Sequence, residues 1–250
     1  MSDVPEGYRM SEVGVIPEGW EEERLGKECE LITKGTTPTS LGKEFKDNGI
    51  NFIKIESLEE NGTIIHEKIA FIDEETHRLL TRSQLKENDV LVSIAGALGR
   101  IAIVKAEILP ANTNQALAIV RLKPQTKLNR NYLFYFLNSA RITKHIDAIN
   151  VQAAQANLSL ENINDFTIFI PPLLEQQAIA SALSDVGALI TALGQLITKK
   201  RNIKQGAMQQ LLTGEKRLPG FGGGWEEKRL GEIVREFVNG GTPSTQFENY

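Results

Sequence analysis

The chain is poor in the residues from which catalytic and metal sites are built. It holds one cysteine and three histidines in 250 residues, and His66, His77 and His145 do not show the spacing of metal ligands. The sequence has no Gly-Lys-Ser/Thr phosphate-binding loop and no Gly-x-Ser-x-Gly nucleophile turn. We therefore expect no catalytic site, no metal and no cofactor in this chain.

The sequence also lacks the Asp/Asn-Pro-Pro-Tyr/Phe motif with which DNA amino-methyltransferases hold a flipped base. Its one Pro-Pro pair, Pro171-Pro172, is flanked by Ile170 and Leu173, so the amide and the aromatic ring are both missing. The run Glu21-Glu22-Glu23 is typical of a solvated charged face rather than of a nuclease carboxylate pair. A free-standing methyltransferase or nuclease is therefore disfavoured.

A single cysteine cannot form a disulfide within the chain, which fits a reducing, cytoplasmic location. We expect Cys29 to be a small buried apolar residue, because a second copy of its segment, described below, carries Val234 at that position. The N-terminus has no apolar stretch, and no run of 18 apolar residues occurs in the chain. We therefore expect neither a signal peptide nor a membrane span.

The chain also has no excess of positive charge. The net charge is −4 and the sequence pI is about 5.6, which argues against a nucleic-acid binder that works by charge alone. A local basic patch on an acidic protein still permits sequence-specific DNA binding. Hydrophobic residues make up 41% and charged residues 24% of the chain, as in a soluble globular protein with a core of useful size.

The most informative feature that is present is a long internal repeat. Residues 19–40 align without gaps on residues 224–245 with ten identities in 22 positions, and both tryptophans of the chain occupy the same repeat position. The period of 205 residues is too long for a solenoid and has the size of a whole domain. We infer one complete domain over residues 1–170 and the truncated start of a second over residues 225–250.

The complete domain has the pattern of a mixed α/β (α+β) fold with short strands and a few helices, after an irregular arm over residues 1–18. Short β-branched or apolar runs bounded by Gly, Pro, Asn or Asp predict strands at 51–55, 89–94, 101–104, 116–122 and 166–170. Residues 73–80 and 131–146 are the best helix candidates, and Asn129 or Asn131 suits the N-cap of the second.

A different pattern begins at Pro171 and runs to residue 213. This stretch predicts one coiled-coil-type helix of about 40 residues, roughly 60 Å long, that ends before Gly214. A domain of this size cannot cover so long an apolar stripe, so we expect a second long helix as its partner. Residues 214–224 form a glycine-rich linker. The residues that we expect to pair the helices recur with alternating spacings of four and three, and the last of them continues the same heptad pattern further along the helix. They are Ile179, Leu183, Val186, Ile190, Leu193, Ile197 and Leu211.

Three loops carry residue types that contact DNA. Gly96–Arg100 is either a glycine turn with Arg100 in solvent or a loop that brings Arg100 to a phosphate or a guanine edge. Ala111–Gln115 is either an Asx-rich turn or a set of amides at an adenine edge, and Lys34–Pro38 is a turn into a strand or a phosphate loop. The residues that we expect to contact DNA are Lys34, Thr36, Thr37, Lys54, Ser93, Gly96, Gly99, Arg100, Asn112, Asn114 and Gln115.

Several segments together resemble one family, the specificity (S) subunits of type I restriction–modification systems. The resemblance is carried by Gly19–Gly26 with Gly35–Ser40, by Asp89–Gly99 and by Asn157-Leu158. Its most specific block is Ile-Phe-Ile-Pro-Pro-Leu-Leu-Glu-Gln-Gln-Ala-Ile-Ala at 168–180. Each block alone is weak, but the ordered set covers essentially the whole chain.

The resemblance implies two target-recognition domains, each followed by a long helix, with the two helices packed antiparallel as a spacer. Each domain would read one half of a split sequence in double-stranded DNA. Adenine methyltransferase subunits, and restriction/translocase subunits, would dock on this non-catalytic subunit. S-adenosylmethionine, ATP and Mg²⁺ would belong to those partners.

The chain departs from the family pattern because it holds one complete recognition domain and one long helix. Isologous pairing of two chains would bury the apolar stripe, so we expect a homodimer that reads an interrupted palindrome. The alternative is a coiled-coil assembly protein whose globular head binds protein. Sequence-selective DNA affinity that depends on salt distinguishes the two hypotheses.

Overall fold

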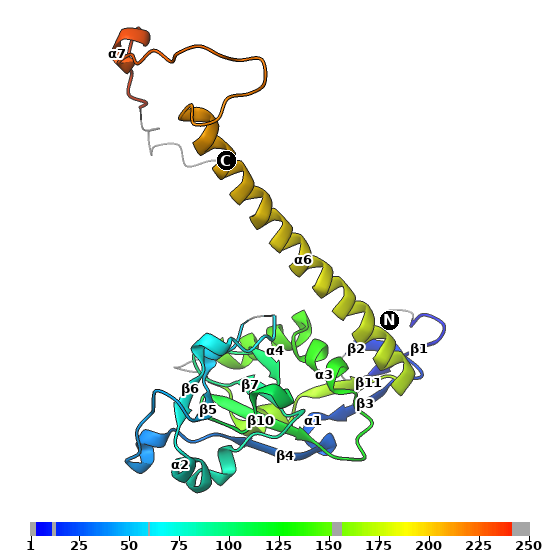
Figure 1. The fold of residues 1–250 in the computed structure, drawn as a ribbon. Helices are drawn as coiled ribbons and strands as arrows, with labels where there is room; N and C mark the ends of the chain where they lie inside the picture. The colour runs from blue at the N-terminus through cyan, green and yellow to red at the C-terminus, as the bar shows by residue number, and fades with distance from the viewer. Residues whose placement is uncertain (1–3, 12–13, 60, 152–156, 242–250) are drawn as a thin grey trace. The chain divides into compact units, whose positions relative to one another are not determined.

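The chain divides into two units, and the boundary between Gly187 and Ala188 lies inside one long helix. The first unit contains every strand formed by the residues that the structure describes, and Figure 1 shows these strands with the helices that accompany them. The expected class, a mixed α/β domain followed by one long helix, is confirmed. The computed structural model describes residues 4–11, 14–59, 61–151 and 157–241.

A four-stranded antiparallel sheet is the centre of the first unit. The sequence predicts three of its strands, but it does not predict β4, because polar residues at both ends of β4 interrupt the apolar pattern. Pairing with β10 makes β4 a strand despite its composition. The strand order is β4 (Cys29–Lys34), β10 (Leu117–Leu122), β7 (Val90–Ser93) and β8 (Ile101–Ile103).

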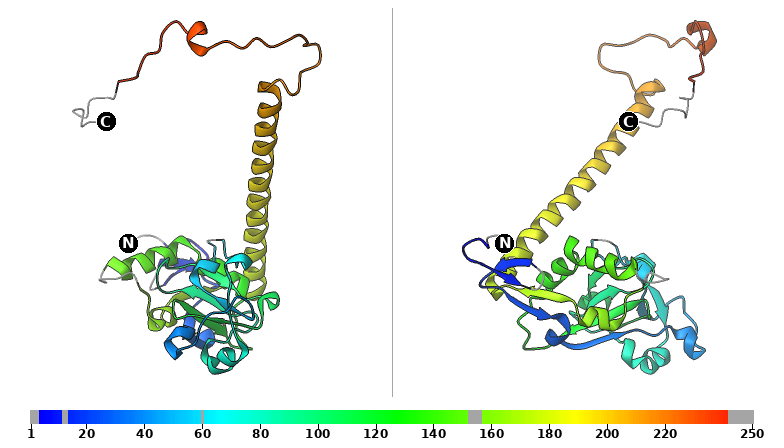
Figure 2. Two further views of the ribbon diagram at one scale, coloured as in Figure 1. Left: turned by 60° about the vertical axis from the view of Figure 1, so that its left-hand side comes forward. Right: turned by 180° about the vertical axis from the view of Figure 1, so that it is seen from behind.

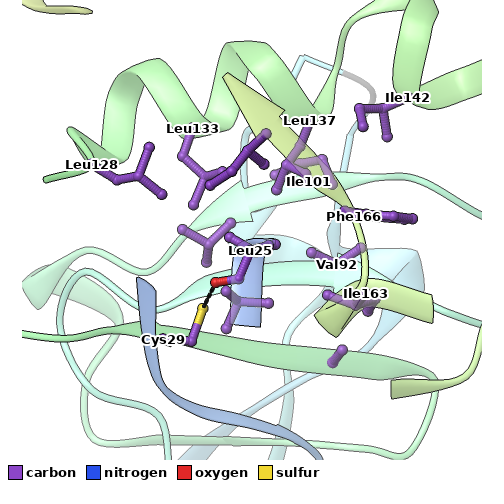
Figure 3. Close-up of a cluster of buried hydrophobic side chains, with 14 of the residues drawn as sticks. Leu25, Cys29, Val92, Ile101, Leu128, Leu133, Leu137, Ile142, Ile163 and Phe166 are labelled. Carbon is purple, nitrogen blue, oxygen red and sulfur yellow. Dashed lines mark hydrogen bonds between the residues drawn. The ribbon is translucent and has the colours of Figure 1, made fainter. Parts of the chain in front are cut away.

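Side chains alternate between the two faces of this sheet. Val92 belongs to a core that includes residues of α3 (Arg130–Leu137) and α4 (Ala140–Val151), and Figure 3 shows it facing side chains of these helices. Its neighbour Leu91 belongs to a separate core under a second sheet. Both faces are therefore covered, one by helices and the other by strands. Figure 2 shows the ribbon from two further sides.

The second sheet has three strands. β5 (Ile50–Ile53) lies in the middle, antiparallel to β6 (Ala70–Ile72) and parallel to β9 (Ala111–Thr113). α2 (Glu74–Leu79) follows β6, and the Asp73 side chain accepts a hydrogen bond of 2.7 Å from the Thr76 N–H at its start. The predicted strand at 51–55 and helix at 73–80 are thus present with slightly shorter bounds.

The N-terminal segment contains strands that the sequence does not predict. The expected irregular arm includes a hairpin of β1 (Tyr8–Ser11) and β2 (Gly14–Pro17). The run Glu21-Glu22-Glu23 lies in β3 (Glu21–Arg24), which pairs with β11 (Thr167–Ile170), and its side chains are exposed or half-buried there, as expected of a charged face. Strand pairing overrides the low β propensity of glutamate here.

The predicted helix at 131–146 is two helices. α3 begins after Asn129, whose side chain accepts hydrogen bonds from the N–H groups of Asn131 and Tyr132, so the first of the two proposed caps is confirmed. The chain leaves α3 at Asn138 and starts α4 at Ala140. Short α5 (Leu160–Asn164) has a capping box at Ser159 and leads into β11.

The long helix α6 spans Leu173–Leu212, which confirms one helix of 40 residues. It ends before Gly214, whose φ of 75° is the left-handed conformation expected at a helix C-terminus. One 18-residue window has a mean hydropathy of 1.4, so by length and composition α6 could cross a membrane. The sequence prediction of no span considered only uninterrupted apolar runs, and polar residues interrupt this window.

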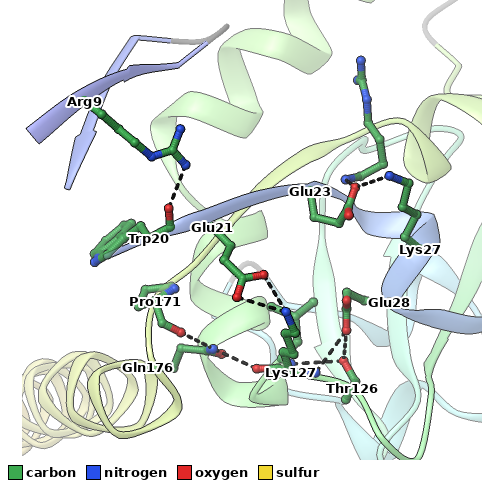
Figure 4. A network of polar contacts seen from close by, with 12 residues as sticks. Arg9, Trp20, Glu21, Glu23, Lys27, Glu28, Thr126, Lys127, Pro171 and Gln176 are labelled. Carbon is green, nitrogen blue, oxygen red and sulfur yellow. Dashed lines mark hydrogen bonds and ion pairs between the residues drawn. The ribbon is translucent and has the colours of Figure 1, made fainter. Parts of the chain in front are cut away.

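The start of α6 is fixed to the first unit by the buried side chain of Gln176, which Figure 4 shows beside Pro171 and Lys127. Its Oε1 accepts a hydrogen bond of 2.8 Å from the Asn129 N–H. Its Nε2 donates to the Lys127 and Pro171 carbonyl oxygens at 2.9 and 2.8 Å. One side chain thus joins the α3 cap, the exit of β11 and the first turn of α6. Within the run Glu175-Gln176-Gln177, the second residue has this physical role.

We predict that Gln176→Ala lowers the free energy of unfolding by about 2–3 kcal/mol, because it leaves buried backbone groups without partners. Chemical denaturation followed by circular dichroism measures this change. The matched control is Gln177→Ala, which removes the exposed neighbouring amide and should change stability by less than about 0.5 kcal/mol. Equal losses in the two variants would contradict a clamp at Gln176.

Candidate nucleic-acid interface

Several strands end, and one begins, at the same side of the first unit. Lys34 at the end of β4 lies opposite Ala118 near the start of β10. β5 and β9 run parallel, so the residues that follow them leave their sheet side by side. The Thr36 N–H donates to Thr113 O at 3.2 Å and so connects the two sheets. We call this region the strand-end surface, and it comprises residues 34–37, 54, 82, 96 and 114–116.

Gly35 permits the closest backbone approach on this surface. A Cβ at Gly35 would lie 1.9 Å from the Thr113 oxygen and 2.5 Å from the Asn114 oxygen. Both neighbouring atoms belong to backbone, which cannot turn aside as a flexible side chain can. Glycine is therefore required for the exits of β4 and β9 to meet.

Two side-chain pairs bridge the segments of the strand-end surface. Arg82, exposed in the 3₁₀ turn Thr81–Ser83, donates from Nη2 to Thr36 Oγ1 at 3.0 Å. Thr37 Oγ1 donates to Gln115 Oε1. The Gln115 amide nitrogen then remains available as a donor, while Thr37 restricts the rotation of the amide. The pairing places one cation and one oriented amide on the same surface.

The cations of the strand-end surface are not neutralised by carboxylates. Lys34, Lys54 and Arg82 make no ion pair with any carboxylate in the part of the chain that the structure describes. Lys54 Nζ lies 5.6 Å from the centre of the Phe45 ring. Neighbouring Lys43, by contrast, is paired with Glu75 at 2.8 Å, and this partner raises its pKa. The unpaired cations make the surface locally positive on an acidic protein.

Two of the residues expected to contact DNA lie inside the fold. Ser93 is fully buried, and its hydroxyl donates to Ala97 O and accepts from the Arg100 N–H. Asn112 is also fully buried, with its amide nitrogen on Leu80 O and its oxygen in contact with His77 Nδ1. Both side chains stabilise turns and strands, so we correct their assignment and leave them out of the candidate interface.

The glycine turn is confirmed, but Arg100 is not free in solvent. Gly96 and Gly99 both have φ of 75°, which side chains with a Cβ rarely adopt. Gly96 reaches the strand-end surface, where its position faces the Ile55 side chain. Arg100 is half-buried and donates from Nη1 to Leu58 O at 2.9 Å. Gly99 and Arg100 therefore shape the turn beside the surface.

The Asx turn at Asn114 is also confirmed, because its Oδ1 accepts a hydrogen bond of 3.1 Å from the Ala116 N–H. Each of the two interpretations of Ala111–Gln115 therefore holds for a different part of the segment. Asn112 and Asn114 are structural, while Gln115 is exposed. Arg82 is absent from the residues expected from the sequence, because no glycine, motif or charge cluster marks its turn.

The described residues offer no group of three or more His, Cys, Asp or Glu side chains that could hold a metal ion. Cys29 is buried, as expected, and its Sγ donates to Leu25 O at 3.2 Å. Burial, with a smaller contribution from the Glu28 charge, raises the pKa of the Cys29 thiol to about 12. The thiol is therefore neutral at physiological pH and unsuited to nucleophilic attack.

A second candidate surface is the apolar stripe of α6. Gln176 and Ala180 are the buried residues of this helix, whereas the residues expected to pair helices are exposed or, at Ile179 and Leu211, half-buried. Ile179, the first residue of the stripe, packs against the main core of the first unit. At about 100° per residue, Leu183 lies only about 20° around the helix from Gln176, so the stripe begins beside the buried positions and continues along exposed residues.

Comparison with known proteins places the first unit and most of α6 in one family. Residues 17–204 match the family model of the type I restriction modification DNA specificity domain. A putative type I restriction enzyme specificity subunit, MjaX, of Methanocaldococcus jannaschii is 27% identical over 83% of this chain and 49% of its own length. The EcoBI specificity subunit of Escherichia coli is 26% identical over 80% of this chain and 43% of its own. The chain thus spans about half the length of these relatives.

Solved structures show the same fold. The HsdS subunit from Thermoanaerobacter tengcongensis aligns with a TM-score of 0.55 and 20% identity over 82% of this chain and 47% of that one. A chain from a study of complex assembly and conformational transition in the type I R-M system aligns with a TM-score of 0.57 and 20% identity, over 78% and 46%. Both likenesses extend over about half of the solved chain.

The close approach at Gly35 gives a direct test of how the strand-end surface is held. We predict that Gly35→Ala costs about 1–3 kcal/mol of unfolding free energy, because the new methyl group forces the β4 and β9 exits apart. Gly19→Ala is the control, because a Cβ there meets nothing within 4 Å. Thermal unfolding of the two variants measures the difference, and a Gly35→Ala protein as stable as the control would show that the exits can separate freely.

Proposed function

The chain belongs to the family of type I restriction modification DNA specificity domains, and on this premise we propose that it reads a DNA sequence on behalf of a modification enzyme. The observation that carries the proposal is the family match over residues 17–204, which includes the α/β unit and most of α6. Its relatives are named specificity subunits. We accordingly propose a non-catalytic role for this chain.

We propose that the strand-end surface faces the DNA. Lys34, Lys54 and Arg82 suit phosphate contacts, because each is a cation without a carboxylate partner among the described residues. Gln115 suits a base edge, because Thr37 orients its amide and leaves the amide N–H groups exposed. Thr37 and Gln115 therefore contribute specificity, and the cations contribute affinity that weakens with salt.

We further propose that two chains pair through α6. The stripe from Ile179 to Leu211 has heptad-like spacing, and its central residues are exposed. Gly187 and Gly194 would let a second helix come close, because a Cβ at either position meets nothing within 4 Å. A lipid bilayer would have to accommodate the polar residues between stripe positions, so a second copy of α6 fits this helix better. Such a dimer would present two identical strand-end surfaces for an interrupted palindrome.

The remaining assignments rest on the family relation. We propose residues 1–170 as a recognition domain, 171–213 as a spacer, 214–224 as a linker and 225–250 as the start of a second recognition domain. Adenine methyltransferase subunits, and in a restricting complex the translocase subunits, would dock on the chain in the cytoplasm. S-adenosylmethionine, ATP and Mg²⁺ would bind to those partners.

The proposed phosphate contact predicts a change in salt dependence. For the duplex selected from a random library, Arg82→Ala should reduce the slope of log affinity against log salt by about 0.9, because one fewer counterion is released. Lys86→Ala is the matched control, because Lys86 precedes β7 and thus lies near the opposite end of that strand from Ser93.

Fluorescence anisotropy with and without the methyltransferase subunit measures this slope. If the slope falls equally in the Arg82→Ala and Lys86→Ala variants, Arg82 does not make the proposed phosphate contact. Absence of sequence-selective binding by the unaltered chain in either condition would instead favour the alternative, an assembly protein whose head binds protein.

The proposed helix pair predicts that a charge on the stripe separates the chains. Leu193→Lys should convert a dimer of twice the 27.7 kDa chain mass into a monomer, because two cations would be buried between the helices. Gln195→Lys is the control. Gln195 lies two residues after Leu193, which is about 200° around the helix, so its side chain faces away from the stripe.

Light scattering gives the mass of each variant, and circular dichroism shows whether the first unit stays folded. Leu193→Lys should retain the unfolding transition of the unaltered chain. A folded Leu193→Lys dimer would exclude the stripe as the pairing surface.

A further inference from the structure

The two copies of the repeat share a local structure as well as a sequence. α1 (Leu25–Glu28) and α7 (Leu230–Ile233) are four-residue helices at equivalent repeat positions. The residue before each is arginine, with φ and ψ of −77° and 134° at Arg24 and −70° and 142° at Arg229. The chain therefore enters both helices in the same conformation. The equivalents of residues 37–40, at 242–245, lie outside the described residues.

The surroundings of the two copies differ. Leu25 is 0% exposed in the main core, whereas its equivalent Leu230 is 63% exposed. Trp20 is half-buried, whereas its equivalent Trp225 is 55% exposed. The second copy thus carries core-type side chains that its present surroundings do not bury.

The first copy shows what these side chains fit. Trp20 donates from Nε1 to the Glu175 carboxylate at 3.2 Å, and its ring centre lies 6.4 Å from that of Phe169. Arg24 donates from Nη1 to Asp165 O at 2.6 Å and to Thr167 Oγ1 at 3.2 Å. We call the surface formed by residues 160–170 and Glu175 the opening-segment face. Trp225 and Arg229 carry the same groups in the second copy.

A glycine supports the same fit. A Cβ at Gly26 would lie 1.9 Å from Asn164 Oδ1 on the opening-segment face. Its equivalent Gly231 has no atom within 4 Å of an added Cβ, so nothing in its present surroundings requires glycine. If residues 225–233 docked on the opening-segment face, Gly231 would lie against Asn164, where only glycine fits.

The charges are also compatible. Glu23 and Lys27 form an ion pair of 2.8 Å in the first copy, and Lys228 and Glu232 occupy the same two positions with both signs reversed. Reversal of both signs keeps the attraction between positions i and i+4.

We propose that residues 225–233 of one chain bind the opening-segment face of a second copy, in place of that copy's residues 20–28. The two segments offer this face nearly the same groups, but the resident segment runs directly into β4 and keeps Glu28, which accepts from Thr126 Oγ1 at 2.7 Å. The visiting segment has Ile233 there. Exchange is therefore a minor, reversible state. It requires neither DNA binding nor pairing through α6, so it extends beyond the proposed function.

A covalent trap tests the exchange in the full chain. Leu25 N donates to Phe166 O at 2.9 Å, so the adjacent pair Arg24 and Thr167 is of the non-hydrogen-bonded kind, with Cα atoms about 4.5 Å apart. This spacing suits a disulfide. We replace Cys29 by Val, the residue of the second copy, and introduce Thr167→Cys with Arg229→Cys. Oxidation should accumulate a covalent dimer of twice 27.7 kDa on a non-reducing gel.

Two control variants calibrate the trap. Thr167→Cys with Arg24→Cys should give a disulfide within one chain, because these residues are register partners. Thr167→Cys with Glu215→Cys, an exposed residue outside the repeat, should give no specific product. The proposal is overturned if the Arg229 variant forms no more dimer than the Glu215 variant. A disulfide within one chain at Arg229 would overturn the second copy as the occupant.

Rescue of a damaged resident segment is an independent readout. Leu25→Asp places a carboxylate in the core and should expel the resident segment. The second copy should then restore the fold in a dimer, so the unfolding midpoint should rise with protein concentration. Leu230→Asp alone should unfold as the unaltered chain does, while the double variant should lose its cooperative transition. Identical behaviour of Leu25→Asp and the double variant would overturn the exchange.

Discussion

The attachment of α6 to the first unit depends on one buried amide. The side-chain amide of Gln176 pairs with three backbone groups, which are the Asn129 N–H and the carbonyl oxygens of Lys127 and Pro171. These backbone groups come from the α3 cap, the loop before it and the exit of β11. Because buried polar groups must be paired, each of the three segments is held in position by the other two. The direction in which α6 begins therefore follows from hydrogen bonds within the first unit.

The two candidate surfaces differ in chemistry. Gln176 and Ala180 are the positions at which α6 is buried, and the heptad stripe begins beside them and continues along exposed residues. At the other surface, the register of β4 with β10 and of β5 with β9 sets which loops meet. One surface is apolar and periodic, and the other is polar with unpaired cations. Their chemistry suits a second helix and a nucleic acid respectively.

Local patterns in the sequence predict the parts of the fold that depend on local forces. β7 and β10 are recognisable because β-branched residues face a core on both sides, and α6 is recognisable by its spacing and its terminal glycine. β3 is not, because three glutamates become a strand only when β11 supplies a partner. Side-chain direction is equally hidden. Ser93 and Asn112 have residue types that suit DNA contacts, but the pairing of their strands points them into the interior.

Most residues of the strand-end surface lie in three loops that the sequence singles out, and only the tertiary structure brings these loops together. Arg82 has no signal in the sequence, because its role arises from contact with Thr36, which is 46 positions away. The repeat shows the opposite case. Leu230–Ile233 forms the same short helix as Leu25–Glu28 without the core that buries Leu25, so local sequence is sufficient for this conformation. A segment that is already helical loses less conformational entropy when it docks, so its binding needs fewer new contacts to become favourable.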